Sequence, residues 1–318
     1  MSKYYVGIDL GGTDIKVGIL NEDFDIIEKR VIPTFSNRSV ENIVADIVAA
    51  GKAVVKMAGL SESDILHVGV GLPATINNKT NIITFAVNLR WRNVDFIKLF
   101  KELWDIPVFI GNDADAAAIA EVCVGVAKGY DHAIVLTLGT GVGGGLIFDR
   151  KIFKGNGYGT EPGHIIIVVD GEQCICGARG CLEAYASVTA LTRDAKRMME
   201  KHPESLMHRL CGGTDSQITG KMIFDAAKRD DPAAKIVVEN FVKYLGAGIA
   251  SFCNALRPQV VILGGGLSNA GAPLFEPLDQ IVESLIVTTE EGKFPPILKA
   301  KLGNDAGIIG AALFGVSI

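Results

Sequence analysis

One imidazole and three thiols lie close together near the middle of the chain. They fall within the eighteen positions 164–181, and they are His164, Cys174, Cys176 and Cys181. Structural zinc sites hold the metal with four nitrogen or sulfur ligands in a tetrahedron. Glycines at positions 177 and 180 would let the chain turn tightly around the metal. The sequence therefore predicts a closed structural zinc site.

Two carboxylates bracket these four side chains. Glu161 stands three residues before His164, and Glu183 stands two residues after Cys181. A zinc site that only supports the fold has its ligands already and does not need carboxylates beside it. We therefore expect the metal to organise a polar site as well as the local fold.

Two glycine-rich turns each lie between two strand-like segments. The first turn holds Gly11, Gly12 and Thr13, and the second holds Gly139, Thr140 and Gly141. Such turns bring backbone N–H groups close to phosphate oxygens, and the threonines add hydroxyl donors. One turn of this kind could be a plain hairpin, whereas two of them favour binding of a nucleotide triphosphate.

The residues around these turns distinguish between the known kinds of nucleotide-binding site. Asp9 ends the strand before the first turn, where its carboxylate would hold Mg²⁺ through water molecules, and Lys16 would add a positive charge. The second turn also fits the pattern G-x-G-x-x-G, but a strand rather than a helix follows it, which excludes a dinucleotide fingerprint. The sequence contains no P-loop pattern.

A third glycine cluster follows the apolar run 260–263, and it consists of Gly264, Gly265 and Gly266. Bare backbone at the carboxyl end of a strand leaves room for a flat ring, and adenine is the ring that we expect. A purely structural turn is the alternative.

Asn112 and Asp113 open an alanine-rich helix. Asp113 could simply cap that helix. A carboxylate beside an amide that can hold a hydroxyl is also what proton abstraction from an alcohol requires. Asp113 is therefore the candidate general base, and we interpret Asp115 and Glu121 as solvated or hinge residues.

Composition and charge exclude several classes of protein. With 318 residues, 48% of them hydrophobic, the chain can form one large or two medium domains. Its formal net charge of -5 and scattered basic residues argue against nucleic acid or a membrane as partner. The first residues do not have the pattern of a secretory signal, and six cysteines are too few for a disulfide scaffold. We expect a cytoplasmic protein.

Apolar runs and their periodicity predict a mixed α/β chain. Strands are expected at 4–9, 14–20, 26–33, 66–71, 108–111, 133–138, 144–148 and 260–263. Helices are expected at 40–58, 93–104, 113–126, 187–200, 233–255 and 306–314. The motif of strand, glycine turn and strand occurs twice, which predicts two similar halves. We expect a small domain of residues 1–112 and 305–318, and a large domain of residues 113–304 that carries the zinc-binding segment 161–183.

Together these motifs resemble the ROK family of sugar kinases, within the actin-like ATPase superfamily. Segments 7–13, 138–141 and 261–266 are similar to the two phosphate motifs and the adenosine motif of that superfamily. The pattern Glu-x-Gly-His at 161–164 and the pattern Cys-x-Cys-Gly-x-x-Gly-Cys-x-Glu at 174–183 are specific to ROK proteins. The resemblance covers nearly the whole chain. It implies a two-domain α/β fold of the actin-like, ribonuclease H-like kind, with a cleft between the domains.

The resemblance also implies an activity, which is ATP-dependent phosphorylation of the 6-hydroxyl of glucose, a step of carbohydrate metabolism and glycolysis. Asp113 would take the proton of that hydroxyl as it attacks the γ-phosphate of MgATP. The residues that would hold the sugar are Asn88, Asn112, Asp113, Glu161, His164 and Glu183. ATP, Mg²⁺ and a structural Zn²⁺ are the expected cofactors, and a homodimer or homotetramer is the expected assembly.

Three residues depart from the family's usual pattern, and they are Ala74, Asp115 and Pro162. Because Pro162 lies inside the Glu-x-Gly-His pattern, the preferred sugar stays open among glucose, fructose, mannose, allose, N-acetylmannosamine and N-acetylglucosamine. A sugar-responsive ROK regulator is a further alternative, although such proteins carry an N-terminal DNA-binding helix-turn-helix and this chain reaches its first phosphate motif by residue 7. A filament or chaperone ATPase would have no reason for the zinc-binding segment.

Overall fold

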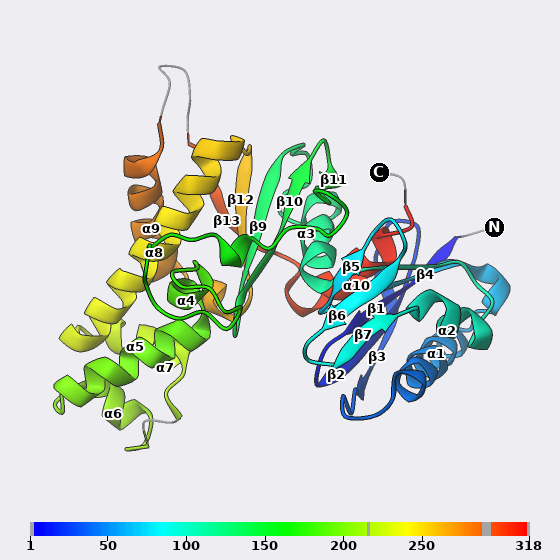
Figure 1. Cartoon of the computed structure of the whole chain (residues 1–318), viewed down its shortest axis with the longest axis horizontal. Helices are drawn as coiled ribbons and strands as arrows, with labels where there is room; N and C mark the ends of the chain where they lie inside the picture. Colours follow the sequence, from blue (N-terminus) through cyan, green and yellow to red (C-terminus); the bar gives the residue numbers. More distant parts are fainter. Residues whose placement is uncertain (1–2, 215–216, 288–293, 317–318) are drawn as a thin grey trace. The chain divides into compact units, whose positions relative to one another are not determined.

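The computed structural model describes residues 3–214, 217–287 and 294–316, and its strands form two five-stranded sheets and one three-stranded sheet within these ranges (Figure 1). The first sheet has the order β3-β2-β1-β4-β8. Its strands are β1 (Tyr4–Leu10), β2 (Asp14–Leu20), β3 (Ile26–Pro33), β4 (Ile65–Leu72) and β8 (Val108–Asn112). β4 runs parallel to β1 and β8, whereas β2 runs antiparallel to β1 and β3.

The second five-stranded sheet repeats this order as β11-β10-β9-β12-β13. Its strands are β9 (Ala133–Leu138), β10 (Val142–Phe148), β11 (Lys151–Ile152), β12 (Val260–Gly264) and β13 (Ile297–Lys299). β12 runs parallel to β9 and β13, and β11 runs antiparallel to β10. The shared order agrees with the prediction of two similar halves. In each sheet the two strands that come first along the chain, β1 and β2 or β9 and β10, flank one of the glycine turns.

Helices complete the two parts of the chain. Those that pack with the first sheet are α1 (Val40–Met57), α2 (Phe96–Leu103), α3 (Asp113–Cys123) and α10 (Ala306–Leu313). Those that follow the zinc-binding segment are α4 (Glu183–Ala186), α5 (Val188–Lys201), α6 (Leu206–Leu210), α7 (Gly220–Lys228), α8 (Pro232–Leu256) and α9 (Ala272–Leu285). Phe96, Phe100 and Trp104 stack in succession in the core beside α1, and Ser39 caps that helix. α8 and α9 lie side by side (Figure 1).

The chain divides into two compact units whose limits differ from the predicted domains. The first unit comprises residues 1–132, 145–160 and 301–318, and the second comprises residues 133–144 and 161–300. The predicted boundary at 112 and 113 is therefore not the observed one. The reason is that α3 packs against α10, and the two helices approach so closely that a Cβ on Gly310 would lie 1.7 Å from the carbonyl oxygen of Ala116.

Two predicted helices differ from the observed ones. The segment predicted as a helix from 93 contains the end of a strand instead, and α2 begins only after Asp95, whose side chain accepts the N–H of Lys98. This strand, β7 (Trp91–Val94), belongs with β5 (Thr75–Asn77) and β6 (Ile82–Ala86) to the three-stranded sheet, which was not predicted. α3 ends at Cys123 rather than at 126, because Glu121 turns back to accept the N–H of Val126.

α8 is long and apolar enough to cross a membrane by length and composition alone, and it is the one such helix among the described residues. Within its most apolar window 61% of the helix is buried. It packs against α4, α5, α7 and α9 of the second unit. Its apolar character is thereby explained by the core that it helps to form.

Candidate functional site

The first glycine turn lies between β1 and β2, and its conformation is fixed by backbone contacts. The Gly11 N–H donates to the carbonyl of Asp14 at 2.9 Å. Thr34 braces the turn from outside, since its hydroxyl donates to the carbonyl of Gly11 at 2.7 Å and its N–H donates to that of Thr13 at 2.8 Å. These bonds leave the N–H of Gly12 and the exposed side chain of Thr13 at the tip of the turn.

Asp9 and Lys16 occupy paired positions on β1 and β2 beside this turn, and their carboxylate and ammonium lie 2.9 Å apart. The carboxylate also lies against the start of α10, because a Cβ on Gly307 would meet Asp9 at 2.6 Å. Asp9 and Lys16, the two charged residues predicted for the nucleotide site, therefore lie next to the first glycine turn.

Three predicted sugar residues lie in the same unit. Asn88 approaches the first glycine turn, where a Cβ on Gly12 would meet its Cβ at 3.4 Å. Asn112 is the N-cap of α3, since its side-chain oxygen accepts the N–H groups of Ala114 and Asp115. Asp113 stands in the first turn and accepts the Ala114 N–H at 2.9 Å. Asn112 is thus the N-cap of α3, and Asp113 shares the Ala114 N–H with it.

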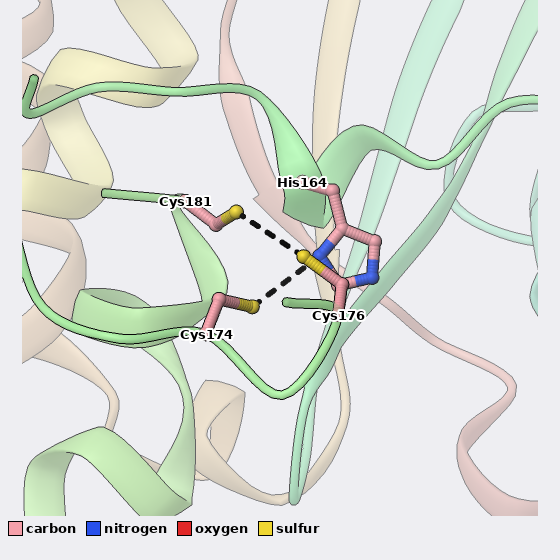
Figure 2. A group of neighbouring side chains, drawn as sticks. All are labelled: His164, Cys174, Cys176 and Cys181. Carbon is pink, nitrogen blue, oxygen red and sulfur yellow. Dashed lines mark hydrogen bonds between the residues drawn. The ribbon is translucent and has the colours of Figure 1, made fainter. Parts of the chain in front are cut away.

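The four predicted zinc ligands converge in the second unit, as Figure 2 shows. Their ligand atoms all lie within 4.8 Å of one another, with 3.6 Å from Cys174 Sγ to His164 Nδ1 and 3.6 Å from Cys176 Sγ to Cys181 Sγ. A tetrahedron with Zn–S bonds of about 2.3 Å and a Zn–N bond of about 2.0 Å has edges of roughly 3.5–3.8 Å. The donor set and its spacing therefore fit a structural zinc ion.

The thiols of this cluster are in different environments. Burial raises the pKa of Cys174 to about 12 and also raises the pKa of Cys181. A backbone hydrogen bond from Ala178 lowers the pKa of the exposed Cys176. Two buried thiols that resist ionisation need a cation beside them to become thiolates, which is the state that binds zinc.

His164 presents its two ring nitrogens differently. Nδ1 faces the cysteines, whereas the other nitrogen points away from them (Figure 2). With Nδ1 on a metal, the second nitrogen is fixed as an N–H donor. Glu161 ends the segment just before the short helical turn Pro162–His164, and it is exposed.

Glu183 connects two parts of the second unit. It begins α4, two residues after Cys181, and one carboxylate oxygen accepts the N–H of Val142 at 2.9 Å. The other oxygen lies 3.7 Å from Cys174 Sγ. The predicted sugar ligand thus contacts both the cysteine cluster and the second glycine turn.

The third glycine cluster lies beside that turn. Gly264 ends β12 opposite Thr137 of β9, and Gly265 has a φ of 79°. A Cβ on Gly265 would lie 2.4 Å from the carbonyl oxygen of Leu138, whereas nothing lies within 4 Å of one on Gly266. The bare and exposed backbone of 265–266 is what a flat ring needs, and it adjoins the second glycine turn.

Sequence reasoning missed one buried ion pair. Asp115 is 3% exposed, and its carboxylate lies 2.9 Å from the ammonium of Lys154. Burial raises the pKa of Asp115, although the positive charge of Lys154 opposes the shift. Glu121 is buried as well, and it accepts N–H groups from Val126 and Leu302. The interpretation of Asp115 and Glu121 as solvated or hinge residues is wrong, because both side chains are buried. The ion pair of Asp115 could not be predicted because its partner, Lys154, lies 39 positions away in the sequence.

Known proteins resemble this chain along almost its whole length. The ROK family matches residues 5–316, and the chain belongs to that family. A glucokinase of Thermotoga maritima is 35% identical over 96% of this chain and 95% of its own. A ROK family glucokinase of Streptomyces griseus, solved with glucose and AMPPNP, is 34% identical and covers 98% of both chains with a TM-score of 0.81. The predicted two-domain actin-like fold class is confirmed by these relatives.

The family also contains regulators. A xylose repressor of Bacillus subtilis is 28% identical over 96% of this chain, but the match covers only 75% of the repressor. The alignment with the Thermotoga glucokinase thus covers nearly all of both chains, whereas the alignment with the repressor leaves about a quarter of the repressor uncovered.

Proposed function

We propose that this protein is an ATP-dependent glucokinase that phosphorylates the 6-hydroxyl of glucose. The observation that carries the proposal is the 35% identity to a glucokinase over nearly the full length of both chains. The two glycine turns, the bare backbone at 265–266 and the Asn112–Asp113 pair supply the groups that a sugar kinase needs. The enzyme is thus a phosphotransferase with an alcohol as acceptor.

Asp113 is the general base of the proposed reaction. The sugar oxygen forms a bond to the γ-phosphorus while the bond from that phosphorus to the β–γ bridging oxygen breaks, and ADP leaves. The proton of the hydroxyl passes to Asp113. Little covalent chemistry is left to the protein, because phosphoryl transfer depends on alignment and on neutralising charge.

The remaining site residues hold the substrates. Asn88, Asn112, Glu161, His164 and Glu183 hold sugar hydroxyls, and the residues that hold the nucleotide are Asp9, Gly11, Gly12, Thr13, Lys16, Gly139, Thr140, Gly141, Gly264, Gly265 and Gly266. Mg²⁺, which Asp9 would hold through water, neutralises phosphate charge when bound. His164, Cys174, Cys176 and Cys181 hold a zinc ion that supplies structure. We expect a cytoplasmic homodimer or homotetramer.

A coupled assay of ADP release tests the substrate. The panel contains glucose, mannose, fructose, allose, N-acetylmannosamine and N-acetylglucosamine, each with MgATP. We expect glucose to give the highest kcat/KM. A higher kcat/KM for another sugar would reassign the substrate within the kinases, and ADP release that no sugar stimulates would contradict the kinase assignment.

A further inference from the structure

The second glycine turn and the first residues of β10 together span residues 139–144, and we call this stretch the ATP turn. It is braced by the predicted zinc-binding segment 161–183 and by the start of α5. Five contacts hold it, three from residues 161–183 and two from the start of α5, and all lie within the second unit. They come from the loop before His164, from Glu183 after Cys181, and from the start of α5. The sequence suggested a role for these segments only toward the sugar.

Glu183 makes the contact that is most directly tied to the cysteines. Its carboxylate accepts the N–H of Val142 at 2.9 Å, and it fits so closely that a Cβ on Gly141 would lie 2.3 Å from it. The same carboxylate lies 3.7 Å from Cys174 Sγ. A backbone N–H bound to a carboxylate is a charge-assisted hydrogen bond, which is stronger than one between neutral groups.

The loop before His164 packs directly on the ATP turn. A Cβ on Gly163 would lie 2.0 Å from the carbonyl oxygen of Val142, so the two backbones are in contact. On the other side, Pro162 would lie 2.9 Å from a Cβ on Gly144. A displacement of the loop that carries His164 would therefore move the ATP turn as well.

The start of α5 closes the turn from the far side. The Val188 N–H donates to the carbonyl of Gly139 at 2.8 Å, and the Thr189 hydroxyl donates to that of Thr140 at 2.7 Å. Only the four-residue α4 and Ser187 separate Cys181 and Leu182 from this helix. The carbonyls of Gly139 and Thr140 are thus held. The N–H of Gly139 is bound by the Gly141 carbonyl and that of Val142 by Glu183, so the N–H groups of Thr140 and Gly141 are the ones that would face phosphate oxygens.

We propose that the zinc-binding segment positions the ATP turn, with Glu183 as the positioning residue that links the two. Occupancy of the cysteine cluster then sets the affinity for the nucleotide triphosphate in addition to that for the sugar. The proposal rests on the nucleotide site of the proposed function. Its physical basis is that a backbone turn binds phosphate well only when its N–H groups are already oriented.

Calorimetric binding of AMPPNP with Mg²⁺, without any sugar, tests the role of Glu183. We expect Glu183→Ala to weaken binding about tenfold or more, since a lost charge-assisted hydrogen bond has effects of that order. Glu183→Gln keeps an acceptor oxygen and should weaken it by about threefold. Glu172→Ala is the matched control, because Glu172 lies in the same segment and pairs with Arg197 instead of the turn. Unchanged AMPPNP affinity in both Glu183 variants overturns the proposal.

The metal is tested with the exposed Cys176 rather than with a buried ligand. Cys176→Ser and its exposed neighbour Ile175→Ser are compared for zinc content, for thermal unfolding and for AMPPNP affinity. We expect zinc and AMPPNP affinity to fall together in Cys176→Ser, with both kept in Ile175→Ser. Loss of zinc from a still folded Cys176→Ser protein that binds AMPPNP normally contradicts the proposal. A wild-type protein that binds AMPPNP but phosphorylates no sugar would defeat the kinase assignment and leave this inference intact.

Discussion

Asp113 is the residue on which the proposed chemistry depends. It stands in the first turn of α3 behind the Asn112 cap, and its Oδ1 accepts the Ala114 N–H. Asparagine has nearly the same shape and keeps that acceptor, but it cannot take a proton. The substitution Asp113→Asn therefore separates the role of base from the role in the fold.

We expect Asp113→Asn to lower kcat for glucose by about 10²–10⁴-fold, the range that general-base catalysis supplies. The thermal unfolding temperature and the affinity for glucose should stay close to those of the wild type. Steady-state kinetics with calorimetry of glucose binding measure both quantities. A variant that keeps near-normal turnover would show that another group accepts the proton.

Asp115 and Lys154 form a buried pair in the same unit, with side chains 5% and 32% exposed. Removing one partner of such a pair leaves an uncompensated charge, which costs more free energy than replacing both. We expect Lys154→Met to lower the free energy of unfolding by about 2–4 kcal/mol, somewhat less than for a fully buried pair because Lys154 is partly solvated. The double variant Asp115→Asn with Lys154→Met should recover most of that loss. Urea unfolding at pH 7 measures it, and a double variant no more stable than the single one would rule out the coupling.

The pH dependence of this pair follows from the raised pKa of Asp115. An acid with a folded-state pKa above its unfolded value binds its proton more tightly when folded, so stability falls as pH rises through the folded pKa. Lys154→Met removes the opposing charge and raises that pKa further. The destabilisation by Lys154→Met should therefore be largest at pH 7 and shrink toward about pH 4, near the ordinary pKa of aspartate.

At the scale of elements, the turn after β12 depends on a glycine conformation. Gly265 has a φ of 79°, and its backbone lies against Leu138 at the end of β9. Its neighbour Gly266 has open space around it and does not have a positive φ. The two glycines are adjacent and chemically identical, so they form a matched pair for substitution.

We expect Gly265→Ala to lower the free energy of unfolding by about 2–4 kcal/mol, since a strained φ and a backbone clash act together. Gly266→Ala should be neutral or stabilise the fold by up to about 1 kcal/mol through the unfolded state. Denaturant unfolding of both variants measures the difference. Equal stability of the two variants would mean that the turn can relax away from Leu138.

The long elements were predictable, whereas short ones were not. β2, β3 and α1 follow clear apolar periodicity, and their observed limits lie within one residue of the predicted ones. β5 and β7 have three and four residues, too few for any period to show. The turns on either side of β6 place Asn81 and Arg90 at positive φ. Asparagine adopts this conformation in some turns, but arginine rarely does, so the second turn has no signal in its residue type.

At the scale of the whole molecule, the same strand order recurs in both five-stranded sheets. In each sheet a glycine turn joins two neighbouring strands, β1 to β2 and β9 to β10, and a later strand, β4 or β12, lies parallel to β1 or β9. The carboxyl ends of parallel strands meet at one edge of a sheet, which is where α/β proteins gather binding groups. In each unit the predicted nucleotide residues lie at this edge, with Asp9 at the end of β1 and Gly264 at the end of β12.

The sequence by itself determined the family, the two glycine turns and the four side chains that gather as candidate metal ligands. These signals are local, because ligand spacing and turn chemistry are set within a few residues of each other. Only the tertiary structure decided that α3 belongs to the first unit, that Asp115 pairs with Lys154 and that Glu183 holds Val142. The last two contacts join residues 39 and 41 positions apart, and such pairings depend on how the elements pack rather than on any pattern along the chain.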